Sequence, residues 1–171
     1  MAHIHLYVAC SLDMLIARPD GAVDWLFTEG DYGYEEFLAG MSTTLMGYKT
    51  FEKVLSFGGE FPYKGLDNIV FTRRQDRAPH PDVHFVHEDM IGFISRLRAE
   101  SKKDIWLIGG GEIVQQCHEA GLIDEYQLFV HPVILGEGLP LFPGLKKQQD
   151  IQLIAHKAHG NGLVHLHYKA K

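Results

Sequence analysis

The chain has 171 residues, of which 46% are hydrophobic and 22% are charged, and its formal net charge is −6 at pH 7. This length and composition predict one globular domain over residues 1–171, with a core that needs no metal or disulfide. The acidic balance argues against a broad nucleic-acid-binding surface, and no apolar run reaches the ~18 residues of a membrane span. Two cysteines and an N-terminus without a signal-peptide pattern predict a cytoplasmic protein.

The first two thirds of the chain alternate predicted strands with predicted helices. Short apolar and β-branched runs predict strands at residues 4–9, 43–46, 68–72, 83–86 and 104–108. Apolar residues at helical spacing predict helices at residues 34–41, 49–55 and 88–100, and another after Gly111. Residues 11–31 have no regular pattern, and an irregular stretch of that length inside a small domain is usually functional.

The last third of the chain changes character. It contains three predicted strands, at residues 126–135, 151–158 and 163–168, with little helix between them. Strands joined by helices, followed by a run of strands, predict a three-layer α/β fold. Its centre would be a mixed, mostly parallel sheet of about eight strands with helices on both faces, finished by a C-terminal antiparallel hairpin.

Three consecutive glycines, Gly109, Gly110 and Gly111, directly follow a nearly apolar strand and open a helix. Such a turn presents free backbone N–H groups at the positive end of a helix dipole, which suits a phosphate group. Glycine allows close approach of the backbone to a ligand because it has no Cβ. A tight turn without a ligand is the alternative, since the pattern is neither GxGxxG nor a Walker motif.

Two other strand ends strengthen the phosphate interpretation. Gly47 ends a strand and is followed by Lys49 and Thr50 at the start of a helix, and the third strand ends in Thr72 and Arg73. In open α/β sheets, ligands bind beyond the carboxyl ends of the strands. These groups together predict a site for a ligand with several phosphates.

The order of six short motifs resembles a known family. In chain order they are IHLYVACSLDMLIA, DGAVDWL, TTLMGYKTFEKV, NIVFTRR, DIWLIGGGEIVQQ and LFVHPVILGEGLPLF. Together they resemble the dihydrofolate reductase-like superfamily, most closely the C-terminal reductase domain of bifunctional riboflavin-biosynthesis deaminase–reductases, in a stand-alone form. The resemblance implies a dihydrofolate reductase-like fold and hydride transfer from NADPH to a pteridine or to the opened sugar of a pyrimidine.

The resemblance also implies which residues contact the cofactor and the substrate. The cofactor-binding positions it implies are Ala9, Ile16, Gly47, Lys49, Thr50, Thr72, Arg73, Gly109, Gly110, Gly111, Glu112 and Ile113. Ile108 and Val130 match positions on the substrate side, and Trp25 matches the tryptophan of the family's mobile active-site loop.

The chain departs from the folate reductases at one cofactor position. Those enzymes carry an arginine directly after the MG dipeptide, facing the 2′-phosphate of NADPH, whereas this chain has Tyr48. Arg73 or Arg74 would supply the charge instead, because a phosphate needs a cation but not one particular side chain. Without such a replacement the preference would move toward NADH.

A second departure concerns the catalytic acid. Folate reductases place a buried carboxylate near the start of the first helix, and Asp31 is the best candidate for it here. Aligning on Trp25 or on Phe37 gives different registers, so the matching residue is Asp31 or Gly33. The structural alternative is that Asp31 caps the helix by accepting backbone N–H groups. The proton would otherwise come from solvent or another carboxylate of the loop.

Eleven histidines include two closely spaced pairs, His3 with His5 and His165 with His167. Residues two apart on a strand share a face, so either pair could chelate a metal ion such as zinc. We adopt the interpretation that both pairs face solvent around apolar neighbours, and predict no metal. Cys10 and Cys117 have no catalytic partner visible in the sequence.

We therefore expect an NADPH-dependent reductase that acts on a small molecule. The favoured substrate is a pyrimidine-linked sugar of the 5-amino-6-(5-phosphoribosylamino)uracil type in riboflavin biosynthesis, or a related heterocycle. The alternatives are a dihydrofolate reductase and a non-catalytic nucleotide-binding protein of the same fold. The chain lacks the H-x-E…C-x-x-C zinc signature of deaminases. The resemblance and the extended C-terminal strands also suggest a homodimer.

Overall fold

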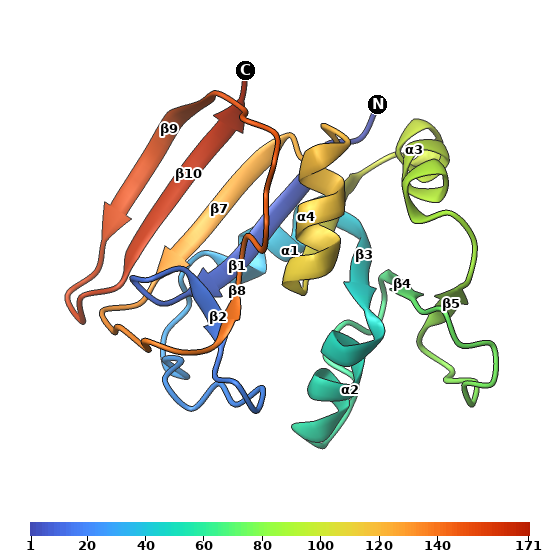
Figure 1. Ribbon diagram of the computed structural model, residues 1–171, viewed down its shortest axis with the longest axis horizontal. Coiled ribbons are helices and arrows are strands. Elements are labelled where there is room, and N and C mark those ends of the chain that lie inside the picture. The colour runs from blue at the N-terminus through green and yellow to red at the C-terminus, as the bar shows by residue number, and fades with distance from the viewer.

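A central sheet of eight strands divides the structure into three layers (Figure 1). The computed structural model describes residues 1–171. The strand order is β5-β4-β3-β6-β1-β7-β10-β9, parallel from β5 to β7, with antiparallel β10 and β9 at one side. The strands are β1 Ile4–Cys10, β3 Met41–Gly47, β4 Asp67–Phe71, β5 His84–Val86, β6 Asp104–Gly109, β7 Glu125–Val130, β9 Ile151–Ala158 and β10 Val164–Ala170.

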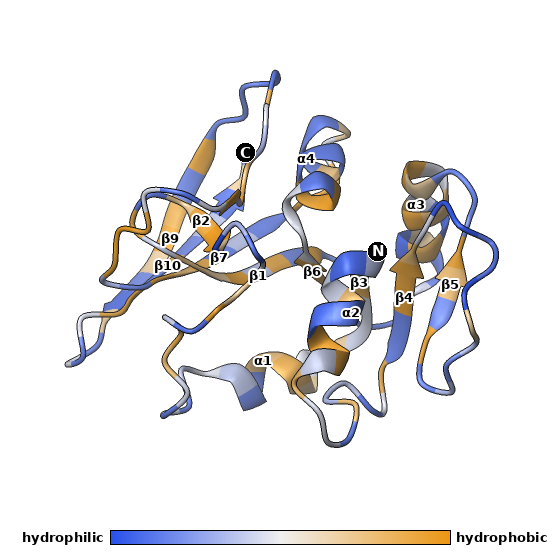
Figure 2. Cartoon of the chain, turned by 60° about the horizontal axis from the view of Figure 1, so that its bottom comes forward, coloured by the Kyte–Doolittle hydropathy of each residue, from blue (hydrophilic) through white to orange (hydrophobic).

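Four helices cover the two faces of this sheet. They are α1 Tyr34–Gly40, α2 Tyr48–Ser56, α3 Met90–Glu100 and α4 Gly111–Glu119. Figure 2 shows α3 and α4 on one face and α1 and α2 on the other. The predicted mixed, mostly parallel sheet with flanking helices and a C-terminal antiparallel hairpin is therefore confirmed. No helix of the chain combines the length and the apolar character needed to cross a lipid bilayer.

The core lies in two clusters, one on each face of the sheet. The larger contains 17 buried residues and joins the sheet to α3 and α4, with Ile94 and Val114 fully buried. The smaller contains 6 buried residues and joins the sheet to α2 through Phe51 and Val54. The central strands are apolar on both sides because both of their faces are covered.

Two predicted element boundaries were wrong. The strand expected over residues 126–135 ends at Val130, where the chain turns away at His131. The segment 11–31, expected to be irregular, contains the short strand β2 Leu15–Ala17, which pairs with β8 Leu139–Pro140. Local periodicity gives no sign of so short a strand, because its partner lies more than 120 residues later in the chain.

The outermost strand, β9, is exposed along all eight of its residues. Its apolar residues Ile151, Leu153 and Ile154 are each 40% to 46% exposed. Long exposed edge strands with apolar residues are places where two chains can pair. The homodimer expected from the sequence stays a prediction.

A buried polar network fixes the loops next to α2. Asn68, on β4 and 1% exposed, donates from Nδ2 to the carbonyl oxygens of Tyr63, Leu66 and Asp82, at 2.9–3.1 Å. Its Oδ1 accepts a 2.7 Å hydrogen bond from the hydroxyl of Thr44 on β3. One amide group therefore ties two loops to the sheet.

We expect Asn68→Ala to lower the free energy of unfolding by about 2–4 kcal/mol, because it leaves buried carbonyl groups without a donor. Urea denaturation followed by circular dichroism measures this as a shift of the midpoint at unchanged slope. Asn161→Ala is the matched control, since Asn161 is exposed. Equal effects of the two variants would contradict the role given to the network.

Candidate functional site

Two helices begin side by side at the carboxyl edge of the parallel sheet. β3 leads through Gly47 into α2, and β6 leads through Gly110 into α4. Met46 on β3 pairs with Gly109 on β6. A Cβ built on Gly47 would lie 3.1 Å from Cδ1 of Ile113 in the first turn of α4. The two predicted phosphate-binding helix starts are therefore neighbours in the structure.

These two helix starts differ from the other two in how they are capped. At α3 the side chain of Asp89 accepts the N–H of Gly92 at 2.9 Å, and at α1 the Asp31 carboxylate accepts the N–H of Tyr34 at 2.7 Å. At α2 and α4 the N-cap residues are Gly47 and Gly110, which make no side-chain cap. The first N–H groups of a helix need partners from outside it, so α2 and α4 keep donors available for an anion.

Gly110 lines a small cradle formed by Thr50 on α2 and Ile16 on β2. A Cβ on Gly110 would meet Oγ1 of Thr50 at 3.5 Å and Cδ1 of Ile16 at 3.8 Å, which are ordinary contacts. At the other two positions the fold itself requires glycine. Gly109 has φ +117°, and a Cβ on Gly111 would collide with the backbone oxygen of Pro140.

Basic side chains surround the outer part of this edge. Lys49 is exposed in the first turn of α2, and Arg73 is exposed just beyond β4. Arg74, by contrast, pairs with Asp76 at 3.4 Å. Thr72 is partly buried, and its hydroxyl accepts the N–H of Arg74 at 3.2 Å.

A third arginine that the sequence analysis did not single out lies over the start of α2. The guanidinium carbon of Arg77 is 3.5 Å from the centre of the Tyr48 ring, a cation–π distance. The Nε of Arg77 is buried without a hydrogen-bond partner. The structure thus places a positive charge at the residue where the folate reductases carry an arginine. A motif search could not find it, because Arg77 is distant in the sequence.

The first loop is held in place by the segment 133–141. The carboxylate of Asp13 accepts the N–H groups of Leu135 and Gly136 at 3.1 and 2.8 Å. Together with a hydrogen bond from Ser11, these donors lower the pKa of Asp13 to about 2. The N–H of Leu12 also donates to the carbonyl of Val133 at 2.8 Å. This loop joins β1 to β2 over residues 11–14, so these contacts fix the segment that leads to Ile16, the residue facing Gly110.

Trp25 is anchored to His131, a residue that follows β7 directly. The Trp25 and His131 rings meet edge to face, with centroids 5.2 Å apart, and the indole Nε1 is buried without a partner. His131 is 4% exposed, lies 3.1 Å from the carbonyl of Phe129 through Nδ1 and accepts the N–H of Phe27 at Nε2. Burial lowers the pKa of His131, which favours the neutral ring that this pair of contacts requires. His131 stood inside a quoted motif, but only the fold reveals its contact with Trp25.

Asp31 takes the structural role that the sequence analysis gave as the alternative. The residue is exposed, and its Oδ1 accepts the N–H groups of Gly33 and Tyr34 at 2.9 and 2.7 Å. The N-cap is Gly33, two residues later than a simple cap at Asp31 would place it. Asp31 is therefore exposed rather than buried, with Oδ1 bonded to the start of α1, and its catalytic role stays a prediction.

The two predicted substrate-side residues lie on different faces of the sheet. Ile108 packs with the smaller core cluster beside α2, whereas Val130 packs with the larger cluster beneath α4. Strand residues alternate between faces, and a short motif does not show which face a residue takes once strands are paired. The assignment of Ile108 and Val130 to the substrate side, which the resemblance implies, stays a prediction.

Neither cysteine is placed for nucleophilic chemistry. Both are fully buried, and burial raises the pKa of Cys10 to about 11 and that of Cys117 to about 12. A thiol with so high a pKa holds almost no reactive thiolate at neutral pH.

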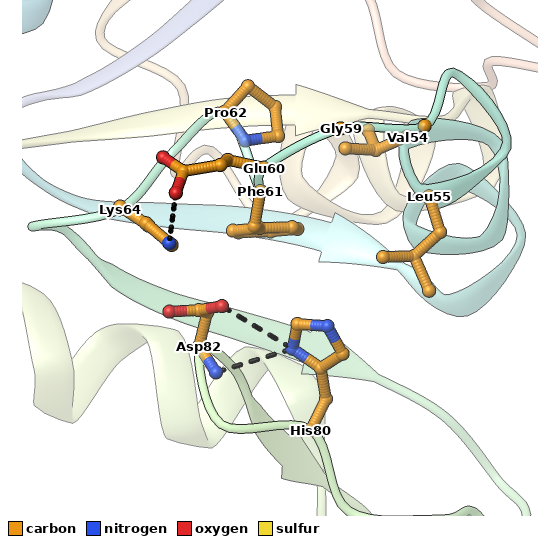
Figure 3. A pocket seen from close by; sticks show the side chains of 10 residues that line it. Val54, Leu55, Gly59, Glu60, Phe61, Pro62, Lys64, His80 and Asp82 are labelled. Carbon is orange, nitrogen blue, oxygen red and sulfur yellow. Dashed lines mark hydrogen bonds and ion pairs between the residues drawn. The ribbon is translucent and has the colours of Figure 1, made fainter.

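A cavity of about 240 Å³ lies at the far end of α2 (Figure 3). Its walls come from the last turns of α2, the loop 58–64 and the loop 80–82. Phe61 and the ion pair between Glu60 and Lys64 border it, and Asp82 faces them beside His80. It contains none of the predicted cofactor residues, so it is separate from the site at Gly110.

Comparison with known proteins places the chain in a family. Residues 2–165 match the family described as the RibD C-terminal domain. The Bacillus subtilis (strain 168) protein YwjB is 39% identical over 166 residues, covering 95% of each chain. The protein YyaP of the same strain is 30% identical over 180 residues, covering 96% of this chain and 93% of its own.

Two solved structures have the same fold. A putative riboflavin biosynthesis protein from Shewanella sp. PV-4 superimposes with a TM-score of 0.88 at 28% identity, over 100% of this chain and 99% of its own. A deaminase/5-amino-6-(5-phosphoribosylamino)uracil reductase from Thermotoga maritima gives a TM-score of 0.77 at 17% identity. That match covers 99% of this chain but 57% of the larger protein, and at this identity it supports the fold alone.

We expect Gly110→Ala to lower the affinity for NADPH by about tenfold or more, because the added methyl group would fill the cradle between Thr50 and Ile16. The protein itself has room for the methyl group, so the melting temperature should change little. Calorimetric titration with NADPH and a thermal melt measure the two quantities.

Gly160→Ala is the matched control, since Gly160 has open space around it. If Gly110→Ala bound NADPH as tightly as the control, Gly110 would not contact the cofactor.

Proposed function

This chain belongs to the RibD C-terminal domain family, and from this premise we propose that it is an NADPH-dependent reductase. The observation that carries the proposal is the meeting of α2 and α4 at the carboxyl edge, where two glycine-started helices keep their first N–H groups free of side-chain caps. A dinucleotide has a diphosphate bridge whose charge suits two helix N-termini.

The residues present fit such a cofactor in three respects. Gly110 leaves the cradle beside Thr50 open, Lys49 adds a positive charge to the first turn of α2, and Ile16 offers an apolar contact on the opposite side. When bound, NADPH would supply a hydride to the substrate. The chain's own contribution would be to hold the donor and the acceptor in a fixed orientation.

We propose a pyrimidine-linked sugar of the riboflavin pathway as the hydride acceptor. The Shewanella structure described as a putative riboflavin biosynthesis protein, 28% identical over the full length, supports this choice. Dihydrofolate is the second candidate, but the folate reductases use a buried carboxylate to bind the pteridine. Asp31 is exposed and already bonded to the start of α1, which argues against it.

The direct test is oxidation of NADPH followed at 340 nm with the purified protein. We expect turnover with 5-amino-6-(5-phosphoribosylamino)uracil and little or none with dihydrofolate. The Gly110→Ala variant serves as the control for activity from contaminating reductases. If only dihydrofolate were turned over, dihydrofolate would be the substrate in place of the pyrimidine-linked sugar. If neither NADPH nor NADH bound, the reductase proposal would be overturned.

Arg77 is our candidate for the group that selects NADPH over NADH. The 2′-phosphate needs a cation near the start of α2, and Tyr48 has none of its own. The stacked guanidinium of Arg77 provides one at the same place, whereas Arg74 is already paired with Asp76. A guanidinium held flat on an aromatic ring keeps its N–H groups in a fixed plane, which suits a phosphate.

We expect Arg77→Gln to lower kcat/KM for NADPH by about tenfold to a hundredfold while changing the value for NADH much less, since a charged hydrogen bond is lost only with the phosphorylated nucleotide. Steady-state kinetics with both nucleotides give the ratio. Arg96→Gln on α3 is the control because its partner is Glu88, away from α2. Equal losses for the two nucleotides would contradict a role in 2′-phosphate recognition.

A further inference from the structure

The amino edge of the sheet carries a cluster of histidines and carboxylates that the reductase proposal does not use. It contains His3 just before β1, His5 on β1 and Glu125 at the first position of β7. One donor atom from each of these three lies within 4.8 Å of the other two. Glu125 is the register partner of His5 across β1 and β7, so the fold itself fixes this pair.

His5 is the residue that departs most from the sequence interpretation. Its side chain is only 9% exposed, so the expectation that His3 and His5 both face solvent is wrong for His5. Its Nδ1 atom is buried and has no hydrogen-bond partner, although it points at Glu125 with 3.3 Å between Nδ1 and Oε2. A buried ring nitrogen facing a carboxylate oxygen needs either a proton or a metal ion between the two atoms.

The other ring nitrogen of His5 has a partner of the kind found around protein-bound metals. Nε2 lies 3.2 Å from Oδ2 of Asp104, the first residue of β6. If Nε2–H donates to that carboxylate, Nδ1 is left with the lone pair that a metal ion binds. The Glu125 carboxylate is also held in place by His167 on β10, whose Nε2 lies 2.6 Å from Oε2 of Glu125.

We propose that His3, His5 and Glu125 bind one divalent transition-metal ion of the zinc type. His3 Nδ1 lies 3.8 Å from Oε1 of Glu125, and His5 Nδ1 lies 3.3 Å from Oε2. The edge of a tetrahedron with zinc–ligand bonds of about 2.1 Å is about 3.4 Å, so the donor atoms, all within 4.8 Å of one another, would have to move closer together around the ion. Two imidazoles and one carboxylate select zinc over magnesium or calcium, which prefer oxygen ligands.

The surroundings define what kind of site this is. His3 is 52% exposed, so the ion would reach solvent on that side and keep a fourth position for water. Lys169, the register partner of Glu125 on β10, is exposed and forms no ion pair with it. The ion would tie the residue before β1 to β7, at the edge of the sheet opposite Gly110.

Calorimetric titration of protein without a histidine tag with zinc chloride tests the proposal. We expect one equivalent to bind, with an affinity that falls about tenfold or more in His3→Ala and in Glu125→Gln. Asp104→Asn should weaken zinc about tenfold to a hundredfold by removing the group that orients His5. Magnesium chloride should give no binding heat.

Two controls separate this site from general binding by exposed histidines. His84→Ala and His156→Ala remove exposed histidines outside the cluster and should leave zinc affinity unchanged. The side chain of His3 is exposed, so His3→Ala removes a proposed ligand without leaving a cavity in the core.

Either of two results would overturn the proposal. One is no saturable zinc binding by the unaltered protein, which would mean that a proton on His5 fills the gap to Glu125. The other is unchanged affinity in His3→Ala. Neither result bears on the proposed reductase activity, whose site lies at the opposite edge.

Discussion

The carboxyl edge of the parallel sheet depends on α2 and α4, two helices whose N-cap glycines supply no side-chain cap, although Glu112 lies in the first turn of α4. A helix N-terminus carries roughly half a positive charge and several unpaired N–H groups. At α1 and α3 the carboxylate of an aspartate accepts one of these N–H groups. At α2 and α4 the N-cap residue is glycine and no aspartate accepts the first N–H groups, which are left for a ligand or for water. The loop between β1 and β2 is held separately, by Asp13 bonded to Leu135 and Gly136, and it leads to Ile16 beside Gly110.

The sequence allowed the architecture and the glycine turns to be predicted because both are local. Apolar runs next to glycine, as at Met46–Gly47 and Ile108–Gly109, report a strand that ends at a helix start without any knowledge of its neighbours. Parallel strands then bring their carboxyl ends to one edge, so Gly47 and Gly110 had to lie near each other. The family resemblance and the residue patterns agreed on this part of the site.

What could not be predicted depends on contacts between distant segments. Whether Asp31 is buried is decided by how α1 begins, and which core cluster Ile108 and Val130 each join is decided by strand pairing. Arg77 stacks on Tyr48 from a loop almost thirty residues away, and no motif links the two. Charge could be counted in the sequence, but only the three-dimensional structure shows which guanidinium lies over Tyr48, and we propose that this group replaces the missing arginine. The alternatives Arg73 and Arg74 were nearer the strand end, yet Arg74 is already paired.

The two ends of the strands offer opposite electrostatic environments, and the two proposed sites follow that difference. Helices α2 and α4 begin at the carboxyl edge, where their N-termini favour anions. Helix α1 ends at the amino edge, just before β3, and its last carbonyls favour cations. Lys103 makes one such contact, since its Nζ donates a 3.1 Å hydrogen bond to the carbonyl of Ala39 in the last turn of α1. His5, which contacts Phe37 of the same helix, lies at that edge with Glu125 and Asp104 around it. These fields favour a cation at the amino edge and an anion at the edge where Gly110 lies, in line with the two sites that we propose.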